Sequence, residues 1–400
     1  MTDAKDEGAR LSSSNYAARV GVALLTLPAI EPIDGGRQVH VDIGDVYPNL
    51  LEALRSDARV KELDAPTPEK NETSARGFST AGRSEHAISD GRPSMPHQHV
   101  HGAAFKYPIT MLIQVPKRLQ PQSQGLEAIP AEEYWAAWDG VELIVLWSNE
   151  DEKKRFGYFG GFAVLDVLEK ATDAAGYGLH VQPCGSSCSY PFAHRDLLVS
   201  ANGNASDAKL EEVDEWTAKI VCPPTAGPLR LVRSLSIQFS HCVHIFASMR
   251  SHGASVWQTE RLARRDLGEL LRLQYESADL RAQPILRSLK SRWKSRSIAR
   301  DTARLTAGLW LRLATLEENQ RGWTEDKYIY EASVARNGFG LVFGVEYPQE
   351  VNSVRSLEVS SLRAAVQQMS ARADTRLVVL ATAGWALAGA LVGGLVSLFR

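Results

Sequence analysis

The chain has 400 residues, of which 44% are hydrophobic and 23% are charged, and its formal net charge is −2. This length exceeds one ordinary hydrophobic core and predicts at least two domains. The near-neutral charge argues against a chain that binds nucleic acid over its whole surface, and four cysteines are too few for a disulfide scaffold. Residues 1–15 contain no apolar run, so no secretory signal peptide is expected, and most of the chain should lie in the cytoplasm.

The first part of the chain divides into three segments by composition. Residues 1–16 are polar and are predicted to be disordered, and residues 17–62 are predicted to form the first part of an α/β domain. Within that part, residues 20–28 have the apolar run of a buried strand, and residues 49–59 can form a short helix. Residues 63–98 place prolines among polar residues, which indicates a flexible linker or a long exposed loop.

Residues 99–250 are predicted to form the main part of the α/β domain, around a mixed sheet. The patterns in this segment predict strands at 107–115, 142–147 and 179–182, a helix at 161–175, and one or two further strands at 229–246. The strand, helix and strand between residues 142 and 182 resemble a βαβ unit, in which a helix joins two parallel strands.

In residues 251–376 the apolar residues recur at helical spacing, and this segment is predicted to form a helical stalk or bundle. Two long helical patterns cover residues 257–276 and 281–318. A turn is expected at 321–325, and a last amphipathic helix is expected at 351–372.

Residues 377–399 contain no charged residue and, as a helix, would extend roughly 35 Å, which is enough to cross the apolar core of a bilayer. A buried core helix is the alternative interpretation. Three arginines precede the segment and only Arg400 follows it, which predicts a cytoplasmic N-terminal bulk; they are Arg363, Arg372 and Arg376. The predicted fold class is therefore an α/β N-terminal domain, a mainly α-helical stalk and one C-terminal transmembrane helix, in a tail-anchored, single-pass protein of the cell membrane.

Gly389 and Gly393 form a GxxxG pair inside the predicted span. Small residues at this spacing allow two membrane helices to approach closely, which favours self-association. We therefore expect helix–helix packing through these glycines, with the lipid bilayer and a second copy of the chain as partners.

A basic amphipathic pattern begins near residue 281. Its candidate membrane-surface residues are Arg287, Lys290, Trp293, Lys294 and Arg296. A basic helix that carries tryptophan can lie on an anionic lipid surface. The alternative is a bundle helix with a solvated arginine face.

Cysteines and histidines gather in two short segments. Cys184, Cys188 and His194 lie in the first segment, and His241 and His244 lie in the second. Structural zinc takes four cysteine or histidine ligands, often supplied as two close pairs, so these residues are candidate zinc ligands. The alternative is a set of buried thiols and surface histidines, and no other cofactor is expected.

Cys184 is also a candidate nucleophile. Residues 182–185 read QPCG, which is similar over four residues to the nucleophile signature of caspases and would imply a hydrolase with a histidine base. His252 is the candidate base, although it follows the cysteine in the chain, which is the reverse of the caspase order. A cysteine nucleophile of this kind needs a base beside the thiol in space.

These features favour a non-enzymatic bacterial protein whose α/β domain acts as a sensor or recruitment module for an unknown cytoplasmic protein, with the stalk and anchor mediating assembly at the membrane. The alternative is a membrane-tethered hydrolase or metal-dependent enzyme that uses the Cys184 cluster. A remote alternative is a subunit of an ion channel or transporter, because the order of elements resembles the CorA family. That family has two spans separated by a Gly-Met-Asn motif, which this chain lacks. No specific nucleic-acid partner is expected.

Overall fold

The computed structural model describes residues 15–28, 43–79, 99–121, 129–149, 159–183, 190–201, 208–223, 225, 227–282, 288–357 and 359–370. The chain divides into two compact units. The first, here called the sheet unit, comprises residues 1–251 and 323–351. The second, here called the helical unit, comprises residues 252–322 and 352–400.

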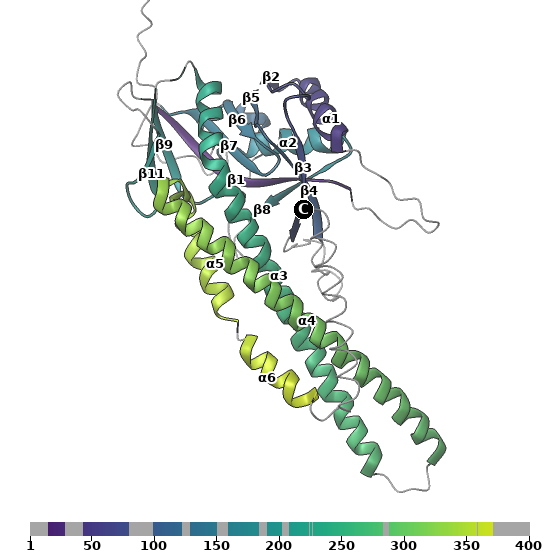
Figure 1. The fold of residues 1–400 in the computed structure, drawn as a ribbon. Helices are drawn as coiled ribbons and strands as arrows, with labels where there is room; N and C mark the ends of the chain where they lie inside the picture. The colour runs from purple at the N-terminus through teal and green to yellow at the C-terminus, as the bar shows by residue number, and fades with distance from the viewer. Residues whose placement is uncertain are drawn as a thin grey trace, which may run out of the picture. The chain divides into compact units, whose positions relative to one another are not determined.

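The sheet unit contains a mixed sheet of eleven strands among the described residues (Figure 1). Its main path runs in the order β10-β11-β9-β1-β7-β6-β5-β2, and β3, β4 and β8 pair off this path. The strands are β1 (Asn15–Thr26), β2 (Val60–Asp64), β3 (Thr73–Ser79), β4 (His99–Phe105), β5 (Ile109–Gln114), β6 (Glu133–Trp138), β7 (Glu142–Ser148), β8 (Gly178–Gln182), β9 (Asp196–Ala201), β10 (Lys209–Glu212) and β11 (Thr217–Cys222).

Strand β1 is the centre of this sheet because it pairs with four other strands. One edge of β1 pairs with β7 and, at Leu25 and Thr26, with β4. The other edge pairs with β9 and then with β8. Val22 is opposite Glu142 of β7 on one edge and opposite Gln182 of β8 on the other. Both partners are antiparallel to β1, so β7 and β8 are parallel to each other with β1 between them.

Helix α2 (Phe162–Ala174) connects β7 to β8, which makes this part of the fold a split βαβ unit. The sequence predicts the strand, helix and strand correctly. It does not reveal that β1, more than a hundred residues earlier in the chain, is inserted between the two strands.

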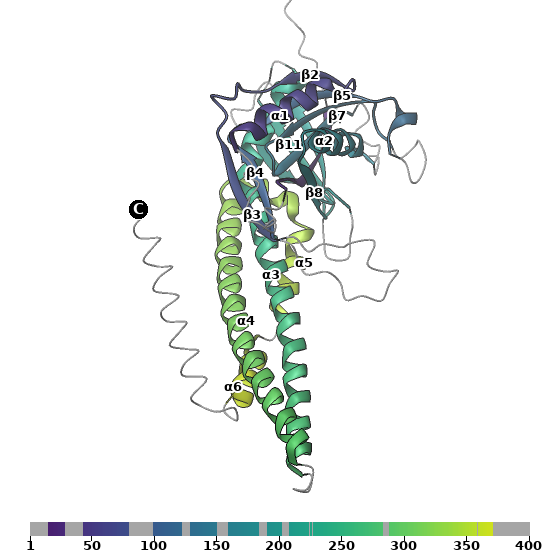
Figure 2. The same cartoon turned by 90° about the vertical axis from the view of Figure 1, so that its right-hand side faces the viewer.

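One face of the sheet is covered by α2 and by α1 (Ile43–Ser56), which lie side by side (Figure 2). Both helices place apolar side chains in one core with alternate residues of β7; these residues include Tyr47, Leu50, Leu54, Val164, Val167 and Leu168 from the helices and Leu143, Val145 and Trp147 from the strand. Burial of each large apolar side chain contributes about 1.5–3 kcal/mol to folding.

The other face of the sheet is covered by the first part of α3 (Pro228–Ala282). Glu142 alternates with Leu143 along β7 and therefore points away from the α1–α2 core. Ser236 of α3 donates a hydrogen bond to Glu142 there. Phe246 of α3 stacks on Phe343 of the 3₁₀ helix η5 (Phe339–Phe343) at 4.0 Å between ring centroids. Helix α5 (Glu346–Arg355) follows η5.

The helical unit consists of the second part of α3, the first part of α4 (Ser288–Asn337) and α6 (Val359–Ser370). Here α3 and α4 run antiparallel, and Asp266 of α3 forms an ion pair with Arg312 of α4 at 2.8 Å. Arg363 of α6 forms an ion pair with Glu317 of α4 at 3.2 Å. The buried apolar residues of this unit include Val256, Ala263, Leu270, Leu273, Ile298, Leu309, Leu313, Leu316, Leu362 and Val366.

Three local sequence-based predictions require correction. Residues 229–246, predicted as strands, belong to α3, because buried Leu235, Phe239 and Val243 recur every four residues and so share one face of a helix. Residues 73–79, predicted within a linker, form β3. The turn predicted at 321–325 is helix, since these residues lie inside α4.

The predicted transmembrane architecture is contradicted. Within the described part of the chain, no helix has the length and the apolar composition that crossing a membrane requires. Helices α3 and α4 are long, but both carry arginine and acidic side chains along their length. The predicted span 377–399, with Gly389 and Gly393, lies outside the described residues. The tail-anchored, single-pass fold class is therefore corrected to a mixed-sheet unit followed by long helices.

Gly140, in the turn between β6 and β7, provides a test of the packing around β1. Its φ is +89°, and a Cβ added there would lie 2.3 Å from the carbonyl oxygen of Ala103. We expect Gly140→Ala to lower the free energy of unfolding by more than about 2 kcal/mol, because the backbone strain adds to a clash with the main chain. Denaturant unfolding followed by tryptophan fluorescence measures this loss.

Gly176→Ala is the matched control. Gly176 also has a positive φ, of +80°, but no atom lies within 4 Å of the added Cβ. We expect Gly176→Ala to lower the free energy of unfolding by about 1 kcal/mol, because only the backbone strain of a positive φ acts there. Equal losses for the two variants would show that Gly140 is not held against β4 as described.

Candidate functional site

The most buried group of ionisable side chains lies between the β6–β7 turn and α3. Asp139 is buried in that turn, and its Oδ1 accepts hydrogen bonds from the backbone N–H groups of Val141 and Glu142 at 2.9 and 2.7 Å. Its Oδ2 lies 2.8 Å from His244 Nε2 and accepts a hydrogen bond from Ser240 Oγ at 3.3 Å. One carboxylate thus holds the turn in shape and joins it to α3.

Glu142 is the second acid of this group and is completely buried. Burial, followed by the negative charge of Asp139, raises the pKa of Glu142 well above its ordinary value, and a hydrogen bond from Ser236 opposes this shift. Ser236 Oγ donates to Oε2 at 3.1 Å, whereas Oε1 has no hydrogen-bond partner among the described residues. Glu142 is therefore held as a neutral acid over a pH range in which an exposed glutamate is ionised.

Asp139, His244 and Ser240 are the residue types of a hydrolytic triad, but their arrangement differs from one. In a triad the hydroxyl donates to the imidazole, which removes its proton during attack. Here the Ser240 hydroxyl bonds to the same carboxylate oxygen as His244. This geometry provides no activated nucleophile, and it supports a structural role for the group.

A second acid–histidine pair lies where β9 begins. The backbone N–H of His194 donates to Oε1 of the buried Glu346 at 2.7 Å, and His194 Nδ1 lies 2.9 Å from the same oxygen. A cavity of about 10 Å³ beside Glu346 is also lined by Gln182 and Arg250. This volume is close to that of a single water, so the cavity is too small for an organic ligand.

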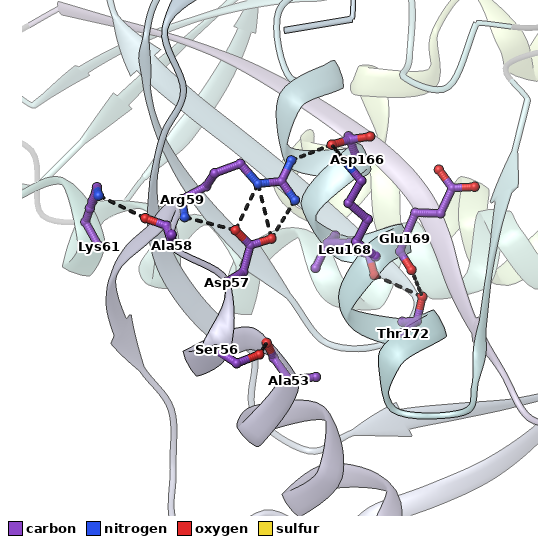
Figure 3. Close-up of polar contacts among 11 residues, drawn as sticks. Ala53, Ser56, Asp57, Ala58, Arg59, Lys61, Asp166, Leu168, Glu169 and Thr172 are labelled. Carbon is purple, nitrogen blue, oxygen red and sulfur yellow. Dashed lines mark hydrogen bonds and ion pairs between the residues drawn. The ribbon is translucent and has the colours of Figure 1, made fainter. Parts of the chain in front are cut away.

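Arg59 forms a third polar cluster, at the surface between α1 and α2 (Figure 3). Its guanidinium donates to Asp57 at 2.9 Å and also to Asp166 of α2. Asp166 is shared with Lys170 at 2.9 Å. The hydrogen bond from Arg59 is the largest cause of the lowered pKa of Asp57. These groups are partly exposed, so each pair contributes at most about 1 kcal/mol, which is appropriate to a structural clamp.

The candidate zinc ligands are only partly described. Cys184 and Cys188 lie outside the described residues. His194 is bonded to Glu346, and His244 is bonded to Asp139, so the two histidines are each oriented by a different carboxylate. His241 is exposed on α3. No group of three or more metal-ligating side chains occurs within the part of the chain that the structure describes, and the zinc site stays a prediction.

The other predicted site residues are dispersed. His252, the candidate base, lies in the helical unit, where its ring packs against Gly322 of α4. Among the predicted membrane-surface residues, Lys294 and Arg296 are exposed on α4. Arg287 and the side chains of Lys290 and Trp293 lie outside what the structure describes. This surface role also stays a prediction.

Sequence reasoning missed an exposed face of α3 in the helical unit. Trp257 is 47% exposed, Leu271 is 43% exposed and Tyr275 is 75% exposed, although all three are large and apolar. They lie on one line of alternating four- and three-residue steps, here called the α3 stripe, which consists of Trp257, Arg261, Arg264, Gly268, Leu271 and Tyr275. All six positions are exposed.

The packed side of α3 in this unit is a different line of residues. Val256, Ala263, Leu270 and Leu273 are buried. At 100° per residue, the centre of the stripe lies roughly 130° around the helix from this buried side. The spacing from 257 to 275 is present in the sequence, but a single helical pattern does not show which of two apolar sides is packed within the chain.

Comparisons with protein-family models, with curated proteins and with solved structures gave no match to this chain.

The neutral state of Glu142 leads to a prediction about pH. In the native state Glu142 keeps a proton that the unfolded chain loses at its ordinary pKa, near 4.5. The free energy of unfolding should therefore fall as pH rises between that value and the raised native pKa, by about 1.4 kcal/mol per pH unit within this window. Glu142→Gln should remove this part of the pH dependence, so that the variant gains stability relative to wild type as pH rises.

Denaturant unfolding of both proteins between pH 4.5 and 8 measures this difference. Glu62→Gln, at an exposed position of β2, is the control for the loss of one carboxylate. A constant stability difference between wild type and Glu142→Gln across the range would contradict the neutral state of Glu142.

Proposed function

We propose that this protein is a non-enzymatic assembly protein that associates with a second copy of itself through the α3 stripe. The observation that carries the proposal is a line of six exposed positions at heptad spacing along α3, three of which, Trp257, Leu271 and Tyr275, are large and apolar. Alternating steps of four and three residues place side chains in one seam along a helix, and this seam is the surface through which helices form coiled coils.

Isolated exposed apolar residues are ordinary on protein surfaces, so the spacing is the significant feature. The core of the helical unit is made by a different side of α3, on which Val256, Ala263, Leu270 and Leu273 are buried. The stripe is therefore additional to the packing among the residues that the structure describes. Trp257 and Tyr275, one near each end of the stripe, are of the residue types that most often anchor protein interfaces.

The polar groups of the sheet unit support an assembly role over catalysis. Asp139 is occupied by backbone and side-chain hydrogen bonds on both oxygens. The cavity beside Glu346 is too small for a substrate. A hollow of about 310 Å³ between α1 and the segment after β2 is lined mainly by prolines and apolar residues, with Glu52 and Arg55 as its charged groups. None of these sites joins a nucleophile to a base.

The test is the concentration dependence of the mass of the full-length chain in sedimentation velocity. We expect wild type to form dimers and Leu271→Glu/Tyr275→Glu to dissociate at least about 30-fold more readily, because one lost aromatic anchor alone costs about 2 kcal/mol. Leu311→Glu/Tyr328→Glu is the matched control: Leu311 is 42% exposed and Tyr328 is 73% exposed, and both lie on α4.

Circular dichroism confirms that each variant is folded before its mass is compared. A wild-type chain that remains monomeric at all concentrations would overturn the proposal. An equal loss in the stripe variant and in the α4 control would also overturn it, because association would then depend on general surface hydrophobicity.

A further inference from the structure

Charged residues divide the segment of α3 that carries the stripe into two halves of opposite sign. Residues 257–265 carry three arginines against one glutamate, a net charge of +2; they are Arg261, Arg264, Arg265 and Glu260. Residues 269–279 carry three acids against one arginine, a net charge of −2; they are Glu269, Glu276, Asp279 and Arg272. Gly268 lies between the two halves. Asp266 lies between the halves, where it is buried and pairs with Arg265 at 3.4 Å and with Arg312 of α4 at 2.8 Å.

Part of this charge is already paired along the helix. Arg264 pairs with Glu260, and Arg272 pairs with both Glu269 and Glu276, within their own halves. Two further pairs reach outside the halves: Arg265 with Asp266 at 3.4 Å, and Glu276 with Lys294 of α4 at 4.0 Å. Counting Asp266 and Lys294 changes +2 to +1 and −2 to −1, so the two halves keep opposite signs.

The direction of a second copy decides which halves meet. In a parallel pair each half would face its own duplicate, and like charges across an interface are repulsive. In an antiparallel pair the basic half of each copy faces the acidic half of the other. We infer that the α3 stripes of two copies pair antiparallel and cross at Gly268, an inference that rests on the self-association proposed above.

The antiparallel crossing also gives each apolar position near Gly268 an arginine of the other copy as its neighbour. Arg261 and Tyr275 lie seven residues on either side of Gly268, so Arg261 faces Tyr275 of the partner subunit, where a guanidinium can stack on the aromatic ring. Arg264 lies four residues before Gly268, and Leu271 lies three residues after it. The aliphatic stem of Arg264 therefore covers Leu271 of the partner subunit.

Gly268 itself is suited to the crossing point. It is exposed, and no atom lies within 4 Å of the position that a Cβ would occupy. A glycine inside a helix costs about 1 kcal/mol relative to alanine, and no described neighbour of Gly268 requires a glycine at this position. Where two helices cross, the absence of a side chain allows closer approach of the backbones.

Distances between spin labels in the full-length dimer test the direction. The parent protein carries Cys184→Ser and Cys188→Ser, while Cys222 and Cys242 are buried and inaccessible to the label. Single cysteines are introduced at Gln258 and at Ala278, each ten residues from Gly268. In the antiparallel pair, identical sites are 20 residues apart, or roughly 30 Å along the helix. In a parallel pair they face each other at about 10 Å.

We expect long distances for Gln258→Cys alone and for Ala278→Cys alone, and a short distance when the two labelled proteins are mixed. Short distances for the single sites and a long distance for the mixture would overturn the antiparallel arrangement while the self-association stands. Absence of any intermolecular signal, in a parent that sedimentation shows to be monomeric, would overturn the self-association itself.

Charge reversal gives an independent readout. Arg261→Glu/Arg265→Glu and Glu276→Arg/Asp279→Arg should each weaken dimerisation by about 10-fold or more, since each makes both halves of the stripe the same sign. The combination of all four changes in one chain should restore it to within about 3-fold, because opposite halves face each other again. A combined variant weaker than either pair would overturn the charge argument.

Discussion

The sheet unit depends on the backbone pairing of β1. This one strand exchanges hydrogen bonds with β7 and β4 on one edge and with β9 and β8 on the other. Its alternate side chains enter opposite layers, so Ala23 and Leu25 belong to the core beneath α1 and α2, whereas Val22 shares a row with Glu142. The indole N–H of Trp138 also donates to the carbonyl of Ala23 at 2.7 Å. The same strand therefore positions side chains on both faces of the sheet.

Helix α3 has two different kinds of neighbour along its length. Its first part packs on the sheet, and Ser236, Ser240 and His244 bond there to two buried acids. Its second part belongs to the helical unit, where one side is packed and the stripe is exposed. The first part of α3 is thus held on the sheet by specific polar contacts, whereas the second part carries the exposed stripe with its three large apolar side chains. A helix with both features can fix its position within the chain and still present a surface to another copy.

The sequence alone predicts those elements whose pattern is strong and local. Strands β1, β5 and β7 are nearly continuous apolar runs, and α2 has an apolar side bounded by glycines, so all four were correctly predicted. Strand β3 was missed because its residues, TSARGFS, include few apolar side chains, and its place is determined by pairing with β4. The first part of α3 was mistaken for strands because serine, cysteine and histidine interrupt its helical spacing.

The candidate site was less accessible to sequence reasoning. Asp139 lies in a short turn and Glu142 begins the strand that follows it, where acids are usually solvated, and α3 packs over both. The exposure of the α3 stripe likewise depends on which side of the helix meets α4. The burial of the two acids depends on contacts with residues about a hundred positions later in the chain, and the exposure of the stripe depends on contacts tens of positions away. A local sequence pattern contains neither kind of contact.

The central place of β1 has a consequence for the order of events during biosynthesis. Tyr16 pairs with Ser148, and Asn15 pairs with Ser200, so the strand leaves the ribosome long before its partners exist. At a synthesis rate of about 5–20 residues per second, β1 remains unpaired for on the order of 10 s. Its sequence, NYAARVGVALLT, is rich in apolar and β-branched residues and carries one arginine as its only charge. Such a segment, with both edges open, is a ready template for pairing with another nascent chain, and protection by a chaperone would be most valuable during this interval.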